Sequence, residues 1–309
     1  MITLKQLRYL DALARHRHFG RAADECSVTQ PALSQQIRLL EDQLRLQLVE
    51  RLSQGIRLTE DGLEIARRAG RVLTEARDLV DHAHHRAEIL TGSLRLGVIP
   101  SIAPYVLPEA LPRLQREFPN LELSIRESLT ATLLDELLSG ALDVALVALP
   151  VAPHERDVET ATLFRDPFVL AVKTAPADAP PATAEEVIAT APLLLLEEGH
   201  CLRDQALAYC QAVRSDMHSR FGASSLTTIL QMVANGFGVT LLPEMSMSAE
   251  VIDPRITLLR FADPAPKRDV GLVWRQSSPR KGDFEALGRV LKGCAEAAGC
   301  GQAAAIPAA

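Results

Sequence analysis

Two cysteines lie nine residues apart in the segment EEGHCLRDQALAYC, residues 197–210, and His200 and Arg203 flank the first of them, Cys201. A thiol with an ordinary pKa near 8.5 is only about 3% thiolate at pH 7, whereas a pKa two units lower would give roughly three quarters. A histidine, an arginine and a helix N-terminus could together lower the pKa by that much. Because thiolate is the form that attacks a peroxide oxygen, Cys201 is a candidate redox-active residue.

Cys210 is the candidate second thiol, since a sulfenic acid can condense with a nearby cysteine. If residues 201–210 form one helix, the two Cα atoms stand about 13 Å apart, while a disulfide needs about 7 Å or less. Forming the bond would therefore unwind the helix and make the segment a two-state element. The chain has three further cysteines, which are expected to be small buried apolar residues: Cys26, Cys294 and Cys300.

The composition is that of a globular protein. The 309 residues are 47% hydrophobic and 23% charged, which predicts two or three domains. No apolar run approaches the roughly 18 residues that span a bilayer, and charges interrupt every apolar cluster near the N-terminus. We therefore expect a cytoplasmic protein in which any disulfide is transient and functional.

Charge is distributed unevenly along the chain. Residues 1–58 hold nine Lys/Arg and six Asp/Glu, a balance of +3, although the whole chain carries −6. A slightly basic head in front of an acidic body fits a nucleic-acid-binding module.

The head reads as a helix, a short second helix, a tight turn and a third helix. Apolar residues recur at helical spacing over 4–15, and the third helix opens at Gln30-Pro31, where proline suits the first turn. The apolar stripe of this helix leaves an outward face that could read base edges or phosphates: Gln30, Pro31, Ser34, Gln35 and Arg38. Taken alone, such a polar face could simply be exposed to solvent. The preceding turn and the net positive charge of residues 1–58 favour a DNA-binding face instead. Residues 51–58 could form a wing that places Arg51 and Arg57 near phosphates.

Residues 59–90 contain no proline, and their apolar positions recur in alternating steps of three and four, which is typical of a long helix that dimerises. A dimer would present two recognition helices to a two-fold DNA site. On this helix, His82, His84 and His85 do not converge on one face, so no metal site is expected.

Behind this helix the pattern changes to β-α-β-α-β over residues 94–149, and a second such unit begins near Phe164. Val270–Trp274 and a helix from Asp283 close the chain, returning to the first unit. No nucleotide-binding, zinc-protease or hydrolase motif is present in the sequence, so we expect neither an enzyme nor a cofactor.

The first 44 residues and the long helix after them resemble the winged helix-turn-helix head of LysR-type transcriptional regulators. The body resembles the two-subdomain, periplasmic-binding-protein-like α/β effector domain of the same family. This resemblance implies a DNA-binding domain over 1–58, a linker helix over 59–90 and a regulatory domain over 91–309. It also implies subdomain I at about 91–163 and 268–300, and subdomain II at about 164–267.

Residues 197–210, and the stretch from Gly222 to Pro243, are very similar to the hydrogen-peroxide-sensing members of that family. The similarity implies that Cys201 is the peroxidatic residue and Cys210 the resolving one. It further implies a peroxide site formed by Ser101, Thr130, His200, Arg203, Asp204 and Arg275. At position 101 those members typically have threonine, and the serine here keeps the hydroxyl but loses the methyl group that restricts its rotamers.

By the same resemblance the partners would be hydrogen peroxide, double-stranded promoter DNA, RNA polymerase, a second copy or a dimer of dimers, and a reductant such as glutaredoxin or thioredoxin. Two other functions stay open. One is a LysR-type regulator whose cleft binds a small organic effector. The other is a thiol peroxidase in which the head only oligomerises, and the outward polar face of the third helix argues against it.

Overall fold

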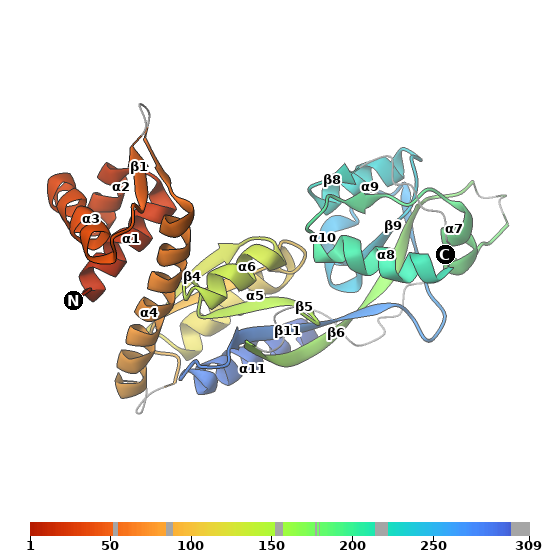
Figure 1. Ribbon diagram of the computed structural model, residues 1–309. Helices are drawn as coiled ribbons and strands as arrows, with labels where there is room; N and C mark the ends of the chain where they lie inside the picture. The colour runs from red at the N-terminus through yellow and green to blue at the C-terminus, as the bar shows by residue number, and fades with distance from the viewer. Residues whose placement is uncertain are drawn as a thin grey trace. The chain divides into compact units, whose positions relative to one another are not determined.

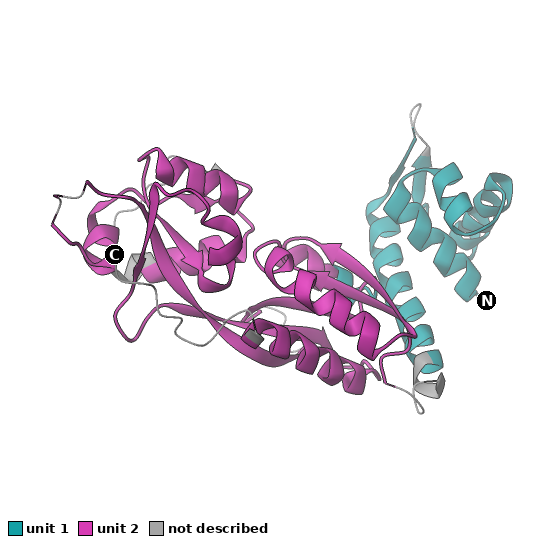
Figure 2. Ribbon diagram, turned by 180° about the vertical axis from the view of Figure 1, so that it is seen from behind, with its two compact units in different colours: residues 1–87, 136–141 teal, residues 88–135, 142–309 magenta. Residues whose placement is uncertain are grey.

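The structure is a computed structural model of the chain, and it describes residues 1–51, 55–84, 89–151, 157–176, 178, 180–213 and 222–297. Two compact units make up the chain (Figure 2). Unit 1 consists of residues 1–87 and 136–141, and unit 2 of residues 88–135 and 142–309.

Unit 1 begins with the predicted three-helix head and wing. Its elements are α1 (Leu4–His16), α2 (Phe19–Glu25), α3 (Gln30–Leu44), β1 (Val49–Arg51), β2 (Ile56–Leu58) and α4 (Glu60–His84). α1 starts with a capping box between Thr3 and Gln6, and α3 starts at Gln30 with proline in its first turn, as the sequence predicts. The apolar faces of the three helices meet in one core that includes Leu10, Leu33 and Ile37. The head is therefore a helix-turn-helix with an antiparallel two-stranded wing.

The long helix α4 packs on α1 and on residues 136–141 of the same unit. Thr74 Oγ1 donates a hydrogen bond of 2.9 Å to the Ser139 carbonyl, and Arg77 donates one of 2.9 Å to the Gly140 carbonyl. Gly140 has a φ of +76°, and a Cβ at this position would lie 1.7 Å from Thr74 Oγ1. Only glycine allows the loop to approach the helix this closely.

Unit 2 contains a seven-stranded sheet in the order β10-β6-β11-β5-β3-β4, with β9 also paired to β6 (Figure 1). Its first part is β3 (Gly92–Val98), α5 (Ala103–Glu117), β4 (Leu121–Glu127), α6 (Thr130–Leu138) and β5 (Val144–Leu149). β3 is parallel to β4 and to β5, as the β-α-β-α-β pattern predicts. β6 (Val158–Lys173) and β11 (Lys267–Arg275) pair antiparallel, so the sheet is mixed.

The remaining elements of unit 2 form a second lobe around β6. They are α7 (Ala184–Thr190), β7 (Leu195–Leu196), α8 (Cys201–Val213), β8 (Gly222–Ala223), α9 (Leu226–Ala234), β9 (Thr240–Pro243), η1 (Glu244–Ser246), α10 (Met247–Glu250) and β10 (Ile256–Arg260); α11 (Lys281–Ala297) belongs to the first lobe. This lobe has its own core, which includes Leu170, Leu195, Ile229 and Leu242. β6 is 16 residues long and runs through both lobes, since it pairs with β11 along one part and with β9 and β10 along the other.

Candidate functional site

Three chain segments bring predicted site residues together in unit 2. Ser101 lies just after β3, Thr130 is the first residue of α6, and Cys201 is the first residue of α8. Gly199, at φ +93°, makes the left-handed turn that leads into α8. A small hollow is lined by Ser101, Thr130, His200 and Cys201 together. Cys201 thus has two hydroxyl groups beside it.

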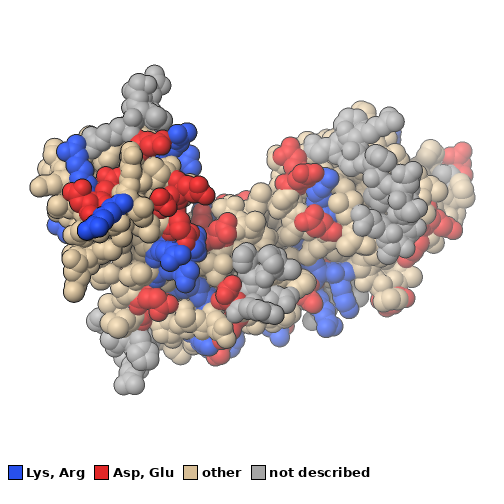
Figure 3. Space-filling view, viewed as in Figure 1, with Lys and Arg blue, Asp and Glu red and all other residues tan. Residues whose placement is uncertain are grey.

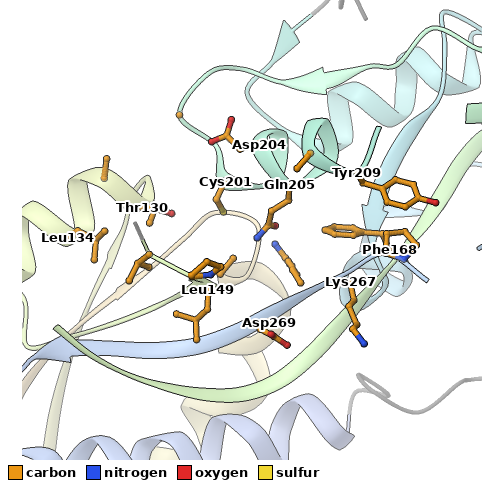
Figure 4. A pocket seen from close by; sticks show the side chains of 18 of the residues that line it. Thr130, Leu134, Leu149, Phe168, Cys201, Asp204, Gln205, Tyr209, Lys267 and Asp269 are labelled. Atoms are coloured by element: carbon orange, nitrogen blue, oxygen red, sulfur yellow. The ribbon is translucent and has the colours of Figure 1, made fainter. Parts of the chain in front are cut away.

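Cys201 and Thr130 also line a much larger cavity of about 950 Å³, together with Asp204 and Gln205 of α8. In Figure 4, Thr130 and Cys201 lie near one another at one side of this cavity, while Phe168 and Tyr209 lie at the other. The cysteine can therefore be reached from a space that holds molecules far larger than peroxide.

A buried arginine that the sequence prediction missed completes this group. Arg268 of β11 donates hydrogen bonds of 2.9 Å from Nη1 to Ser101 Oγ and from Nη2 to the Ser101 carbonyl. Its Nη2 also lies 3.2 Å from the Met245 sulfur. Because Ser101 Oγ accepts from Arg268, the hydrogen of that hydroxyl is free to point elsewhere.

Asp166 of β6 neutralises Arg268. The two residues are cross-strand partners in the β6–β11 ladder, and Arg268 Nε donates to Asp166 Oδ2 at 2.9 Å. Both side chains have 0% exposure, and the other carboxylate oxygen accepts the Met245 backbone N–H at 3.1 Å. Four of the five N–H groups of Arg268 thus have acceptors among the described residues, and the fifth, on Nη1, can donate to another acceptor.

The surroundings of Cys201 act on its pKa in opposite directions. Burial raises the pKa of the thiol above its ordinary value, while the positive charge of Arg268 and the hydroxyls of Thr130 and Ser101 oppose the rise. The net shift is upward, so the expected lowering of the pKa is wrong for this state. The cation that acts on the sulfur is Arg268, whereas the sequence pointed to His200 and Arg203.

Two buried oxygen atoms at this site accept no hydrogen bond from the described residues. They are Thr130 Oγ1 and Gln205 Oε1, and both residues line the large cavity. Buried polar groups are rarely left unpaired, because each unpaired group costs about 1–3 kcal/mol. A small molecule with hydrogen-bond donors and acceptors would satisfy them.

In the head, α3 presents the side chains that the sequence predicts to face outward. Gln30, Pro31, Gln35 and Arg38 are exposed, and Ser34 is half-buried. In the wing, Arg57 is exposed and pairs with Glu50 at 2.7 Å, while the Arg51 side chain lies outside the described part of the structure. Basic and acidic side chains are interspersed over the visible face of the head (Figure 3).

Comparison with known proteins decides the family. Residues 4–63 match the model of the bacterial regulatory helix-turn-helix protein, lysR family, and residues 87–294 match the LysR substrate binding domain. The chain belongs to the LysR family. LysR-family proteins are transcription regulators that bind DNA through this head, and the fold described above is the one that the sequence predicts.

Several relatives of this LysR-family chain have names that mention peroxide or OxyR. A hydrogen peroxide-inducible genes activator from Pectobacterium carotovorum is 42% identical over 295 residues, covering 94% of this chain and 96% of the relative. A full-length OxyR variant from Pseudomonas aeruginosa superposes with a TM-score of 0.78 at 36% identity, covering 94% of this chain and 98% of that one. An H2O2-bound OxyR mutant from Corynebacterium glutamicum gives 0.64 at 35% identity, with 96% and 95% covered.

The other predicted site residues of this LysR-family chain lie in different places. Asp204 lines the large cavity, but Arg203 donates a hydrogen bond of 2.9 Å to the Leu196 carbonyl and so fixes the start of α8. Arg275 donates one of 3.1 Å to the Leu142 carbonyl. It follows Arg268 by seven residues on the same strand, about 24 Å at 3.4 Å per residue. The structure therefore does not bring Arg275 to Cys201.

α8 contains both cysteines of the predicted pair. The helix runs from Cys201 to Val213, so the backbone at Cys210 is helical, although its side chain lies outside the described part of the structure. At 1.5 Å per residue the two Cα atoms are about 13 Å apart, too far for a disulfide. The structure thus describes a state in which the two cysteines are not bonded.

Arg268 and Asp166 gave no usable signal in the sequence. Each is a charged residue near the end of an apolar strand run, a pattern that normally indicates a solvated position. The only clue is that the two paired strands carry opposite charges, and the pairing of these two residues can be seen only once the strand register is known.

Within the described ranges, no group of three or more His, Cys, Asp or Glu could hold a metal ion. No helix there is long and apolar enough to cross a membrane.

Proposed function

We propose that this LysR-family regulator senses hydrogen peroxide through Cys201. The observation that carries the proposal is the arrangement around the sulfur, where the Thr130 hydroxyl, the Ser101 hydroxyl and the buried guanidinium of Arg268 surround one thiol. A peroxide molecule has two donors and several acceptor sites, which is what this group of side chains complements. The names of the OxyR relatives point to the same ligand.

In the proposed reaction the resting Cys201 thiol is protonated, and it gives up its proton as peroxide reacts, so that the attacking sulfur has thiolate character. The Cys201 sulfur attacks one peroxide oxygen, the O–O bond breaks, and the thiol proton passes to the departing oxygen, giving sulfenic acid and water. Arg268 and the Thr130 hydroxyl stabilise the negative charge that develops on the departing oxygen. The raised pKa keeps the thiol unreactive toward other electrophiles until peroxide occupies the site.

In the second step, we propose that the Cys210 thiol attacks the sulfenic acid of Cys201, forming a disulfide and releasing water. The separation along α8 means that the helix must unwind before the sulfurs can meet. The loss of α8 removes a wall of the large cavity and part of the second lobe's core, so the bond reshapes the regulatory domain. A reductant such as glutaredoxin or thioredoxin would restore the helix.

We further propose that the protein binds promoter DNA as a homo-oligomer, either a dimer or a dimer of dimers. The reshaped regulatory domain would change how this oligomer binds the promoter and how it contacts RNA polymerase. Exposed apolar side chains along α4, including Leu63, Val72 and Leu79, support a second copy as partner. The exposed face of α3 would enter the major groove, with Gln30, Gln35 and Arg38 at base edges and phosphates. In this proposal the DNA-binding head is residues 1–58, the linker helix is residues 59–90 and the regulatory domain is residues 91–309.

The experiment is stopped-flow thiol oxidation with stoichiometric hydrogen peroxide, followed by mass mapping of the disulfide. Wild type should lose two thiols and yield a peptide linking Cys201 to Cys210. The Cys201→Ser protein should lose no thiol to peroxide and should keep its affinity for DNA. The Cys294→Ser protein, which lacks a buried cysteine elsewhere, should react as wild type does. A normal peroxide response of the Cys201→Ser protein in promoter binding would end the proposal.

The size of the large cavity favours one second candidate. At about 950 Å³ it matches the pockets that take drug-sized ligands, and the unpaired Gln205 oxygen lies in its wall. A regulator that responds to a small organic effector would use this space. It predicts a melting shift with a metabolite library and no rapid thiol loss with stoichiometric peroxide.

A further inference from the structure

A single carboxylate connects the two lobes of unit 2 close to the peroxide site. Tyr105 of α5, in the first lobe, donates a hydrogen bond of 2.9 Å to Glu250 Oε1. Thr227 of α9, in the second lobe, donates one of 2.8 Å to Glu250 Oε2. Glu250 is the last residue of α10 and also belongs to the second lobe (Figure 1). Each carboxylate oxygen of Glu250 thus accepts a hydrogen bond from a hydroxyl group, one in the first lobe and one in the second.

The ring of Tyr105 strengthens this connection. It is half-buried and packs against the core of the second lobe, although its backbone is in the first turn of α5. Burial and the Glu250 carboxylate both raise the pKa of the Tyr105 hydroxyl, so it stays protonated and remains a donor across the working pH range. The contact therefore does not depend on pH near neutrality.

Tyr105 is also close in the chain to Ser101, which accepts two hydrogen bonds from Arg268. Ser101 is four residues before it, and the turn between them is closed by a hydrogen bond of 3.1 Å from the Tyr105 N–H to the Ile102 carbonyl. At the other end, the segment Glu244–Glu250 contains Met245, whose N–H and sulfur contact Asp166 and Arg268. Ser101 is thus joined to this segment by two routes, through Arg268 and through Tyr105.

From this geometry we infer that Tyr105 and Glu250 are positioning residues for the reaction at Cys201: their hydrogen bond fixes the Ser101 turn of the first lobe, together with the Arg268 side chain bound to it, against Cys201 of the second lobe. The inference rests on the proposed peroxide chemistry and adds residues that do not touch the sulfur. Without the bond, the lobes would separate slightly at this point. The Ser101 hydroxyl would then spend less time within reach of peroxide, and water would enter.

The test uses full-length Tyr105→Phe, Glu250→Gln and the double variant, all as reduced protein. The second-order rate constant for Cys201 oxidation by hydrogen peroxide is measured by stopped flow between pH 5 and 10, with Cys201 loss confirmed by mass spectrometry. We expect each single variant to lower the plateau rate about tenfold. The inflection of the pH–rate profile should also move to lower pH, since burial is what raises the pKa of the thiol. The double variant should be no slower than either single one, because both remove the same bond.

Glu244→Gln is the matched control. Glu244 lies on the same segment and pairs with Arg260 at 2.5 Å, an ion pair contained within the second lobe. The Glu244→Gln substitution should lower the melting temperature of the protein without moving the pH–rate profile of Cys201 oxidation. Unchanged rates in both single variants, multiplying effects in the double variant, or an equal loss of rate in Glu244→Gln would overturn the inference. If wild type itself fails to react, the proposed function fails instead.

Discussion

Replacing Asp166 by asparagine tests the buried ion pair on which the site is built. Both partners have 0% exposure, and Asp166 accepts from Arg268 Nε and from the Met245 N–H. Asparagine keeps the shape but removes the charge, and it turns an N–H group toward one of these donors. Breaking a buried pair by removing one partner costs about 3–5 kcal/mol, because a charge remains buried without compensation. For a unit of this size, that corresponds to a melting temperature lower by about 10 °C.

The same substitution should make Cys201 more acidic. The positive charge of Arg268 favours the thiolate, and Asp166 offsets that charge in the wild type. Once the carboxylate is gone, the uncompensated guanidinium lowers the pKa of the thiol. The protein would then be less stable and more reactive, a combination that a general loosening of the fold does not explain.

Thermal unfolding by circular dichroism measures the first effect, and the pH dependence of Cys201 alkylation by iodoacetamide measures the second. The control is Asp269→Asn, next to Arg268 in sequence. Asp269 pairs with Arg165 at 3.4 Å, and the two side chains are 46% and 68% exposed, so this change should cost less than about 1 kcal/mol. A melting temperature of Asp166→Asn within a degree of wild type would refute the burial argument, and an unchanged alkylation profile would refute the electrostatic one.

Three further predictions concern other parts of the molecule. Gln35→Ala should weaken binding to a promoter fragment selected by wild type by about 1–3 kcal/mol, and leave binding to random DNA unchanged, as measured by fluorescence anisotropy. Gly140→Ala should lower the unfolding free energy of the protein by at least about 1 kcal/mol in chemical denaturation, because the new Cβ meets Thr74 Oγ1 at 1.7 Å and φ is +76°; an unchanged denaturation midpoint would contradict the close approach. Burial raises the pKa of Asp143, but the hydrogen bonds and charge of Arg95 outweigh it and hold the pKa below its ordinary value. This stabilisation is fully present above about pH 4 and is lost as the pH falls through the folded-state pKa, so Arg95→Gln should flatten the acid limb of a stability–pH curve.

Local signals in the sequence were enough to place the elements that carry most of the site. α3 begins at Gln30 because proline suits the first helical turn, and α1 spans Leu4–His16, where apolar residues recur at helical spacing. The helix that begins at Cys201 follows Gly199, a residue visible in the sequence, and the structure gives this glycine the positive φ of the turn. These features depend on neighbours within a few residues, so no knowledge of the rest of the chain is needed to find them.

Tertiary structure alone decided which charge acts on the cysteine. Arg203 is two residues from Cys201 in sequence, but its guanidinium binds the Leu196 carbonyl, and Arg275 lies far along β11. Arg268 reaches the site because the antiparallel register of β6 and β11 sets it opposite Asp166, which is 102 residues away in the chain. Strand register is set by the packing of a whole sheet, and a shift of one residue would turn both side chains to the other face.

The direction of the thiol pKa was likewise out of reach of the sequence. Counting nearby cations predicts a lowered pKa, whereas burial of the sulfur, which depends on how two lobes close around it, raises the pKa. The sequence by itself thus determined the family and the helices, and it predicts the cysteine pair. The folded chain decided the ion pair behind Ser101, the burial of Cys201 and the contact between Tyr105 and Glu250, because each depends on residues that only packing brings together.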